Sequence, residues 1–170
     1  IGVNALQKNT TASNNTAVGN DALGLNTTGA NNTALGHSAL KANTTAGNSV
    51  AIGYRALLAN TTGTQNIAIG VETLDANTTG NYNTAVGKAA LGANTTADYN
   101  IAIGQEALVG NTTGTYNVAV GCFSLRDNTT TNLNTAVGYA ALKENEAAEN
   151  TAVGTNSLQL NTTGTGHAAI

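Results

Sequence analysis

An Ala-Val/Ile/Leu-Gly triplet recurs along the whole chain, and its glycine returns every 17 residues. Only the interval from Gly138 to Gly154 is shorter, by one residue. Self-similarity at a fixed short period is typical of repeat proteins in which each unit stacks on its neighbours. We therefore expect residues 1–170 to form a single repeat array of about ten 17-residue coils. The repeating glycines are Gly19, Gly36, Gly53, Gly70, Gly87, Gly104, Gly121, Gly138 and Gly154.

Each unit begins with a short strand pattern. The residue before the glycine is Val, Ile or Leu, it follows an alanine, and the alanine follows Thr, Val or Ile in nine repeats. This alternation has the period of a β-strand, and β-branched residues favour strands. Glycines and an Asn-Thr-Thr cluster leave no stretch of the length that a helix needs. The sequence predicts an all-β fold, a parallel β-solenoid or β-roll with one 17-residue repeat per coil.

Two further columns repeat strictly. A leucine follows each glycine by four residues, and we expect it to fill the interior together with alanine and the Val, Ile or Leu before the glycine. The first Asn of each Asn-Thr-Thr cluster predicts an amide ladder, because coils stack about 4.8 Å apart. The residue just after each glycine varies from His37 to Tyr54 to Lys88, so this column should face solvent or a partner.

One coil of this size encloses little apolar surface by itself. Side-by-side association of several solenoids would bury more, so we expect a homo-oligomer and favour a homotrimer. The chain starts at Ile1 and ends at Ile170, both at the position before the repeat glycine, which suggests an excerpt from a longer fibre.

The low and scattered charge of the chain argues against binding to nucleic acid or to an anionic membrane surface. Six basic and nine acidic residues give a net charge of -3, and these charges fall in variable columns. A nucleic-acid binder usually carries a basic stripe, and an anionic membrane surface attracts one too, so neither partner is expected. The sequence has no apolar run long enough to span a bilayer and no signal-peptide pattern at its start.

We find no motif for catalysis, a cofactor or a metal. His37 and His167 lack ligand neighbours at metal-binding spacing, and the serines fill repeat columns. The acids Glu72, Asp75, Glu106 and Asp127 lie on different coils and are interpreted as solubilising charges. Cys122 is interpreted as a tolerated substitution, with pairing between chains as the alternative. The segment is therefore expected not to be an enzyme.

Three other features leave alternatives open. Tyr82, Tyr99 and Tyr116 recur one coil apart, so their rings can pack on one another or form a ligand stripe for a sugar. Thr columns suggest ice binding, although adjacent residues of a strand point to opposite faces. The N-glycosylation pattern matches at Asn14 and Asn31 and at the Asn-Thr-Thr clusters, whose asparagines are Asn9, Asn26, Asn43, Asn60, Asn77, Asn94, Asn111, Asn128 and Asn161.

The motif Asn48-Ser49-Val50-Ala51-Ile52-Gly53 closely resembles the head repeat of trimeric autotransporter adhesins, and Asn134-Thr135-Ala136-Val137-Gly138 is similar to repeats of phage tail-fibre proteins. The resemblance covers essentially the whole chain. It implies a trimeric left-handed β-roll, although the family repeat is usually nearer 14 residues and this one is longer by its Asn-Thr-Thr-Gly turn.

Together these features predict a non-enzymatic, extracellular fibre segment on a cell surface or a virion, which extends or mediates attachment to a host-surface receptor or glycan. The alternative is a solenoid that binds glycan or ice through its Tyr or Thr columns. A solenoid depolymerase is a third, weaker reading.

Overall fold

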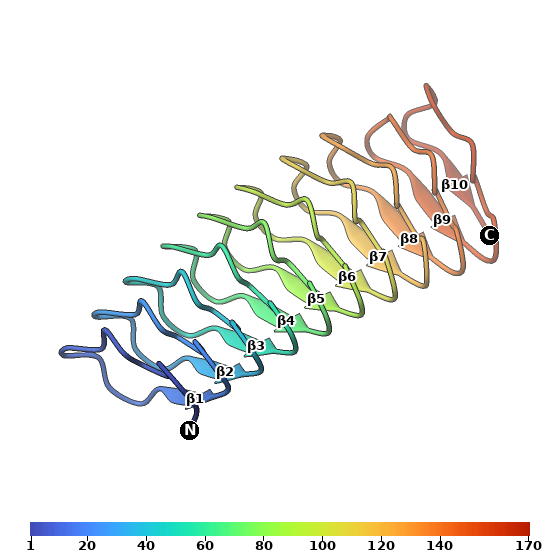
Figure 1. Cartoon of the computed structure of the whole chain (residues 1–170). Helices are drawn as coiled ribbons and strands as arrows, with labels where there is room; N and C mark the ends of the chain where they lie inside the picture. The colour runs from blue at the N-terminus through green and yellow to red at the C-terminus, as the bar shows by residue number, and fades with distance from the viewer.

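The computed structural model describes residues 1–170 and contains ten short strands and no helix. All ten lie in one parallel sheet whose spatial order equals the sequence order, so the chain advances by one strand per coil (Figure 1). The predicted all-β parallel solenoid with about 17 residues per turn is therefore confirmed. The strands are β1 (Thr16–Val18), β2 (Thr33–Leu35), β3 (Val50–Ile52), β4 (Ile67–Ile69), β5 (Thr84–Val86), β6 (Ile101–Ile103), β7 (Val118–Val120), β8 (Thr135–Val137), β9 (Thr151–Val153) and β10 (Ala168–Ala169).

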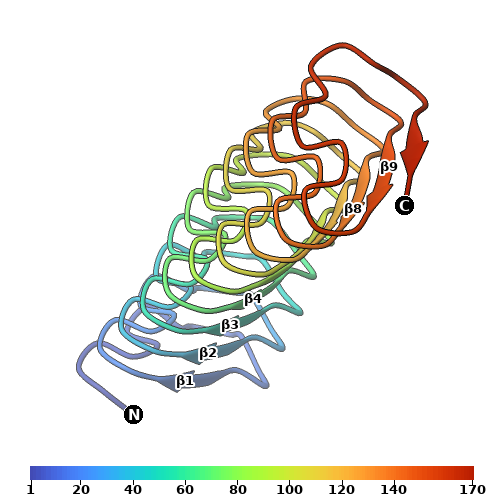
Figure 2. The same cartoon turned by 90° about the vertical axis from the view of Figure 1, so that its right-hand side faces the viewer.

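Register is uniform along the sheet. Each strand alanine pairs with the alanine of the next strand, as Ala85 does with Ala102. Hydrogen bonds between coils are not confined to the strands, because Leu91 N donates to Ala107 O at 3.0 Å on another part of the turn. Figure 2 shows the resulting stack of coils with the strands on one side. One column of the sequence therefore becomes one straight row of side chains along the axis.

The apolar interior is narrow and consists of leucine and alanine side chains. The repeat leucines from Leu23 to Leu142 are fully buried, and the alanines of β2 to β9 are fully buried too. A second row of small residues, three after each corner glycine, joins them; Ala90 and Ala107 are examples. This confirms leucine as the main core column.

The prediction that Val, Ile or Leu before each glycine lies inside the coil is wrong. In β1 to β9 the middle alanine points inward and its two neighbours point outward, so Ile69 and Ile103 remain 37% and 41% exposed. The leucine on the opposite side of the coil already fills the interior. Only a methyl group fits between it and the strand, and the larger side chains must occupy the outer face.

The corners depend on left-handed backbone conformations. The repeating glycines have φ between 119° and 138°, and the neighbouring coil lies close against all of them except Gly154. Three non-glycine residues of most coils also have φ near 50–60°, for example Ala89, Leu91 and Tyr99. This conformation is unfavourable for L-residues. Each of these three residues donates its N–H to a neighbouring coil, and this stabilises the turn.

The shortened repeat does not interrupt the sheet. Thr135 of β8 still pairs with Thr151 of β9, and Leu142 stays buried. The missing residue is absorbed in the turn after Asn145, where the Asn-Thr-Thr-Gly sequence is replaced. The solenoid therefore accommodates the change in one corner.

Candidate functional site

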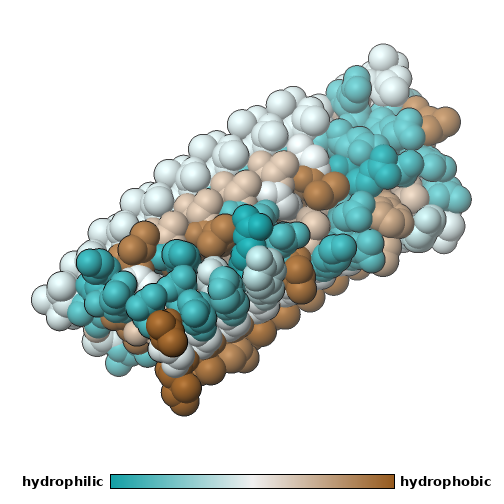
Figure 3. Space-filling model, in the orientation of Figure 1, coloured by the Kyte–Doolittle hydropathy of each residue, from teal (hydrophilic) through white to brown (hydrophobic).

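The outer face of the sheet is a continuous uncharged strip, here called the sheet face, in which the row of third strand residues is apolar throughout and the row of first strand residues is Thr in five of nine strands. It consists of the first and third residues of β1 to β9, which are Thr, Val, Ile or Leu at every position. Neighbouring strands are about 4.8 Å apart and the two rows about 7 Å apart, so the strip measures roughly 40 Å by 7 Å. Brown residues in Figure 3 run along the edge where Figure 1 places the strands.

No charged residue interrupts the sheet face. All but three of the charged residues lie between a corner glycine and the next buried asparagine, on a different side of each coil. The exceptions are Asp98, Glu146 and Glu149. The residue after each corner glycine is exposed throughout, as the sequence predicted, and it ranges from His37 to Lys88. The solenoid therefore has one uncharged side of Thr, Val, Ile and Leu beside one variable, charged side.

The three predicted tyrosines are brought together in a stack just before β5, β6 and β7. The ring centroids of Tyr82 and Tyr99 are 4.8 Å apart and those of Tyr99 and Tyr116 are 5.0 Å apart, with interplanar angles of 2° and 4°. Of the two interpretations, mutual packing is therefore realised. Desolvation raises the pKa of Tyr99, and the neighbouring phenols and Asp98 add to the effect.

This stack limits what the tyrosines can bind. The faces of the Tyr99 ring are covered by the rings of Tyr82 and Tyr116, so the stack presents edges and hydroxyl groups to solvent. An apolar sugar face would need an open ring face. Further along the same column Asn14 donates to Asn31 at 3.1 Å, which makes the column an amide ladder at its other end.

The Asn-Thr-Thr asparagines form the predicted ladder inside the coil. Asn77 Nδ2 donates to Asn60 Oδ1 at 2.8 Å and to Gly80 O at 3.0 Å, and its own Oδ1 accepts from Asn94 at 2.9 Å. The nitrogen that would carry a glycan is thus occupied and fully buried, so in the folded protein a glycan has no room at Asn26, Asn43, Asn60, Asn77, Asn94, Asn111 or Asn128.

The other matches to the glycosylation pattern differ in exposure. Asn9 and Asn161 are half-buried in the terminal coils, and both donate to a carbonyl three residues on. Asn14 and Asn31 have exposed side chains.

Sequence reasoning missed a second buried polar column, immediately before the strands. Asn83 Nδ2 donates to Ala97 O at 2.8 Å, and its Oδ1 accepts from the backbone N–H of Asn100 at 3.0 Å. The signal was available, because this position is Asn or Ser from Asn15 to Asn150. No buried side-chain nitrogen or oxygen lacks a partner.

The paired threonines have different environments. From Thr10 to Thr112 the first hydroxyl of each pair donates to the next coil, as Thr61 Oγ1 does to Thr78 O at 3.0 Å. The second threonine of each pair, such as Thr62, is exposed. A single threonine row therefore faces solvent, in agreement with the expectation that the two residues do not share one plane.

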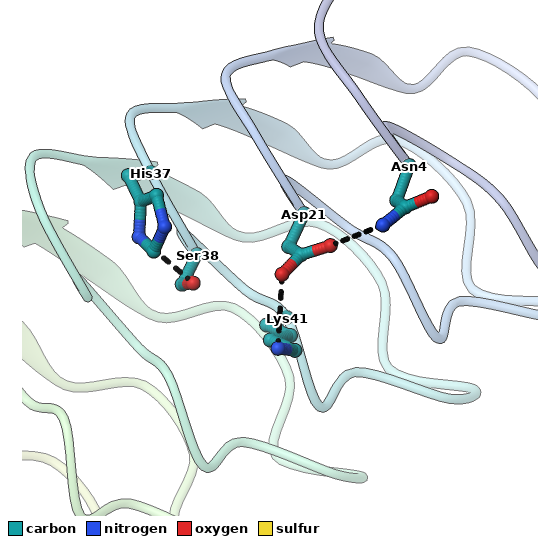
Figure 4. A network of polar contacts seen from close by, with 5 residues as sticks. All are labelled: Asn4, Asp21, His37, Ser38 and Lys41. Atoms are coloured by element: carbon teal, nitrogen blue, oxygen red, sulfur yellow. Dashed lines mark hydrogen bonds and ion pairs between the residues drawn. The ribbon is translucent and has the colours of Figure 1, made fainter.

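A polar network joins the first coils on the variable side (Figure 4). Asp21 accepts from Asn4 Nδ2 and from Lys41 Nζ, both at 3.0 Å, and these hydrogen bonds hold the pKa of Asp21 below its usual range. His37 Nδ1 and Ser38 Oγ are 3.0 Å apart. Both carboxylate oxygens of Asp21 are thus engaged away from the histidine, and the three residues do not form the relay of a catalytic triad.

The remaining candidates stay separate. Cys122 is a free, exposed thiol, and Glu72, Asp75, Glu106 and Asp127 are distributed along the variable side. No group of three His, Cys, Asp or Glu residues is placed to hold a metal ion, and the surface has no pocket. The fold contains no helix that is long and apolar enough to cross a membrane.

Comparisons with known proteins add no relative. No protein-family model matches the chain, and neither the curated proteins nor the solved structures give a match.

Proposed function

We propose that this chain is a non-enzymatic segment of an extracellular structural or adhesive fibre, in which several copies pack together through the sheet face. The observation that carries the proposal is the uncharged sheet face across nine strands, with its uninterrupted row of Val, Ile or Leu. Soluble monomers rarely expose contiguous apolar patches larger than a few hundred Å², and larger patches commonly mark interaction sites. The strip covers roughly 300 Å² even when only the area between its row centres is counted.

Composition supports a second copy of the same chain as the occupant. The sheet face keeps the same residue types over nine coils, whereas the residue after each corner glycine changes from coil to coil. A partner with the same 17-residue repeat meets the same environment at every coil. Charged residues are depleted at the centre of protein interfaces, and here they are absent from the whole strip.

A homotrimer is the preferred assembly. Each coil has a single apolar face, and three copies around a threefold axis can each turn that face toward the centre in a closed symmetric arrangement. The resemblance to trimeric adhesin head repeats favours three copies over two. The charged, variable columns then point outward, where they are available to a host-surface receptor or glycan.

Matched substitutions on adjacent columns test this proposal. Ile69→Asp places a carboxylate on the sheet face, and Val71→Asp places one two residues later, on the variable side. Both side chains are about 40% exposed, so both variants should keep the circular dichroism spectrum of the native fold. We expect the oligomer mass to fall toward one chain only for Ile69→Asp. An unchanged mass for Ile69→Asp, or the same loss for Val71→Asp, would contradict the role of the sheet face.

A ligand-binding solenoid is the second candidate, and the exposed row of second threonines supports it, with one hydroxyl per coil. Replacement of Thr62, Thr79 and Thr96 by valine should then abolish inhibition of ice recrystallisation. Binding to a glycan panel that is lost with Tyr99→Ala would instead favour the tyrosine column.

A further inference from the structure

The phenol groups of the tyrosine stack are reactive, and the packing of the rings on one another does not involve this reactivity. Tyr82, Tyr99 and Tyr116 are 44% to 54% exposed, and each ring lies parallel to the next at 4.8–5.0 Å. The backbone ladder fixes their spacing, so the rings stay neighbours as long as the coils remain folded.

We infer that this stack is a site of oxidative tyrosine cross-linking between consecutive coils, with Tyr99 as the shared partner. The co-reactant is a one-electron oxidant, such as a haem peroxidase with hydrogen peroxide. The product is a dityrosine that joins Tyr99 to Tyr82 or to Tyr116.

Oxidation, radical coupling and rearomatisation convert two tyrosines into one dityrosine. The oxidant removes one electron and one proton from each of two phenols, which gives two phenoxyl radicals. These couple through one ortho carbon of each ring to form a carbon–carbon bond. Each ring then transfers its ortho hydrogen to its oxygen and regains aromaticity. In total, two tyrosines and one hydrogen peroxide give one dityrosine and two water molecules.

The geometry favours this pairing over any other in the chain. Coupling requires two rings to tilt until their ortho carbons meet, and the exposed outer edges of the stack permit the tilt. The other two tyrosines have no tyrosine neighbour. Tyr54 lies on His37 at 5.5 Å, and Tyr139 contacts Phe123 edge-on at 5.7 Å. They serve as internal controls.

Cross-linking within the stack requires Tyr99, because Tyr99 is the only tyrosine adjacent to either of the other two. Tyr82 and Tyr116 lie two coils apart with the Tyr99 ring between them, so removal of the Tyr99 hydroxyl leaves no adjacent pair of phenols. Phenylalanine at this position keeps a ring in the stack and removes only the oxidisable group.

The folded 170-residue chain treated with peroxidase and limiting hydrogen peroxide tests the inference. Dityrosine fluorescence measures the yield, denaturing gels separate links within one chain from links between chains, and peptide mass spectrometry locates them. We expect links within one chain at Tyr82–Tyr99 or Tyr99–Tyr116. Tyr99→Phe should lose at least about nine-tenths of this signal, and Tyr54→Phe should keep it.

Three results would overturn the inference: an unchanged yield in Tyr99→Phe, links only between chains, or an equal yield of the same links from the urea-unfolded chain. A small photochemical oxidant in place of the peroxidase removes the need for an enzyme to reach the rings. Absence of the links with both oxidants would also refute it.

Discussion

Alanine at Gly87 should destabilise the solenoid much more than alanine at Gly92, five residues later in the same coil. Gly87 has a φ of 128°, and a Cβ atom there would lie 2.6 Å from the backbone oxygen of Gly104 in the next coil. Gly92 has no positive φ, and its added Cβ would meet Ala89 O at 3.2 Å and a Val109 methyl at 3.5 Å. The equivalent position of Gly92 in other coils already carries side chains such as Lys41.

Two effects add at Gly87. A non-glycine residue held at a disfavoured φ costs about 1–3 kcal/mol. The clash with backbone atoms, which cannot rotate away, adds a strain of about 1–3 kcal/mol. We therefore expect Gly87→Ala to lower the free energy of unfolding by at least about 2 kcal/mol, or roughly 4–8 °C in Tm for a chain of this size. Gly92→Ala should change it by less than about 1 kcal/mol, because a compatible Gly-to-Ala change acts mainly on the unfolded chain.

Urea unfolding followed by circular dichroism, together with thermal melts, measures the difference between the two variants. Both substitutions remove one glycine from the unfolded chain, so the comparison isolates the folded corner. Equal stability of Gly87→Ala and Gly92→Ala would refute the assignment of the corner glycine as a backbone requirement of the coil.

Two further predictions concern buried polar groups and charge. Asn77→Ala leaves Asn60 Oδ1 and one N–H of Asn94 without their ladder partner, so it should cost about 2–4 kcal/mol in urea unfolding. The exposed Asn20→Ala should cost less than about 0.5 kcal/mol. Equal costs would exclude the ladder as a source of stability. Burial raises the pKa of Asp75 in the folded protein, so as pH rises the unfolded chain loses this proton before the folded one does. The free energy of unfolding therefore falls as pH rises from about 4 through the folded pKa. Asp75→Asn should therefore be more stable than the native chain at pH 7 and should lose that advantage in acid near pH 3; a variant that is less stable at pH 7 would contradict this sign.

Much of the fold could be predicted from columns alone. A strict period, a strand pattern ahead of each glycine and the absence of helical stretches were sufficient to identify the parallel solenoid. The leucine column and the Asn ladder were also accessible, because a residue type that is repeated once per coil must stack on itself. The tyrosine stack followed from the same rule, since three rings at a spacing of one coil have no other neighbours along the axis.

The orientation of the strands could not be predicted in this way. A period-two pattern separates two faces but does not say which one is inside, and the larger residues are normally expected to be buried. Here the leucine opposite the strand leaves room only for Ala85 or its equivalents, so Val86 and Thr84 point outward. Residue type alone does not indicate a left-handed backbone at Leu91 either, because leucine has no preference for that conformation.

Because the large side chains of the strands point outward, the sheet face is the main candidate site of the chain. A row of Val, Ile and Leu that was expected to form part of the core lies on the outer face instead, without charge, across nine strands. The asparagines of the Asn-Thr-Thr turns, which had suggested glycosylation, are buried inside the coil from Asn26 to Asn128.

The native mass of the 170-residue chain in solution, measured by light scattering, tests the central claim most directly. We expect a stable particle of about three times the 16.9 kDa of one chain, which dissociates when the sheet face carries Ile69→Asp. A folded particle with the mass of one chain, unchanged up to high protein concentration, would contradict self-association through the sheet face.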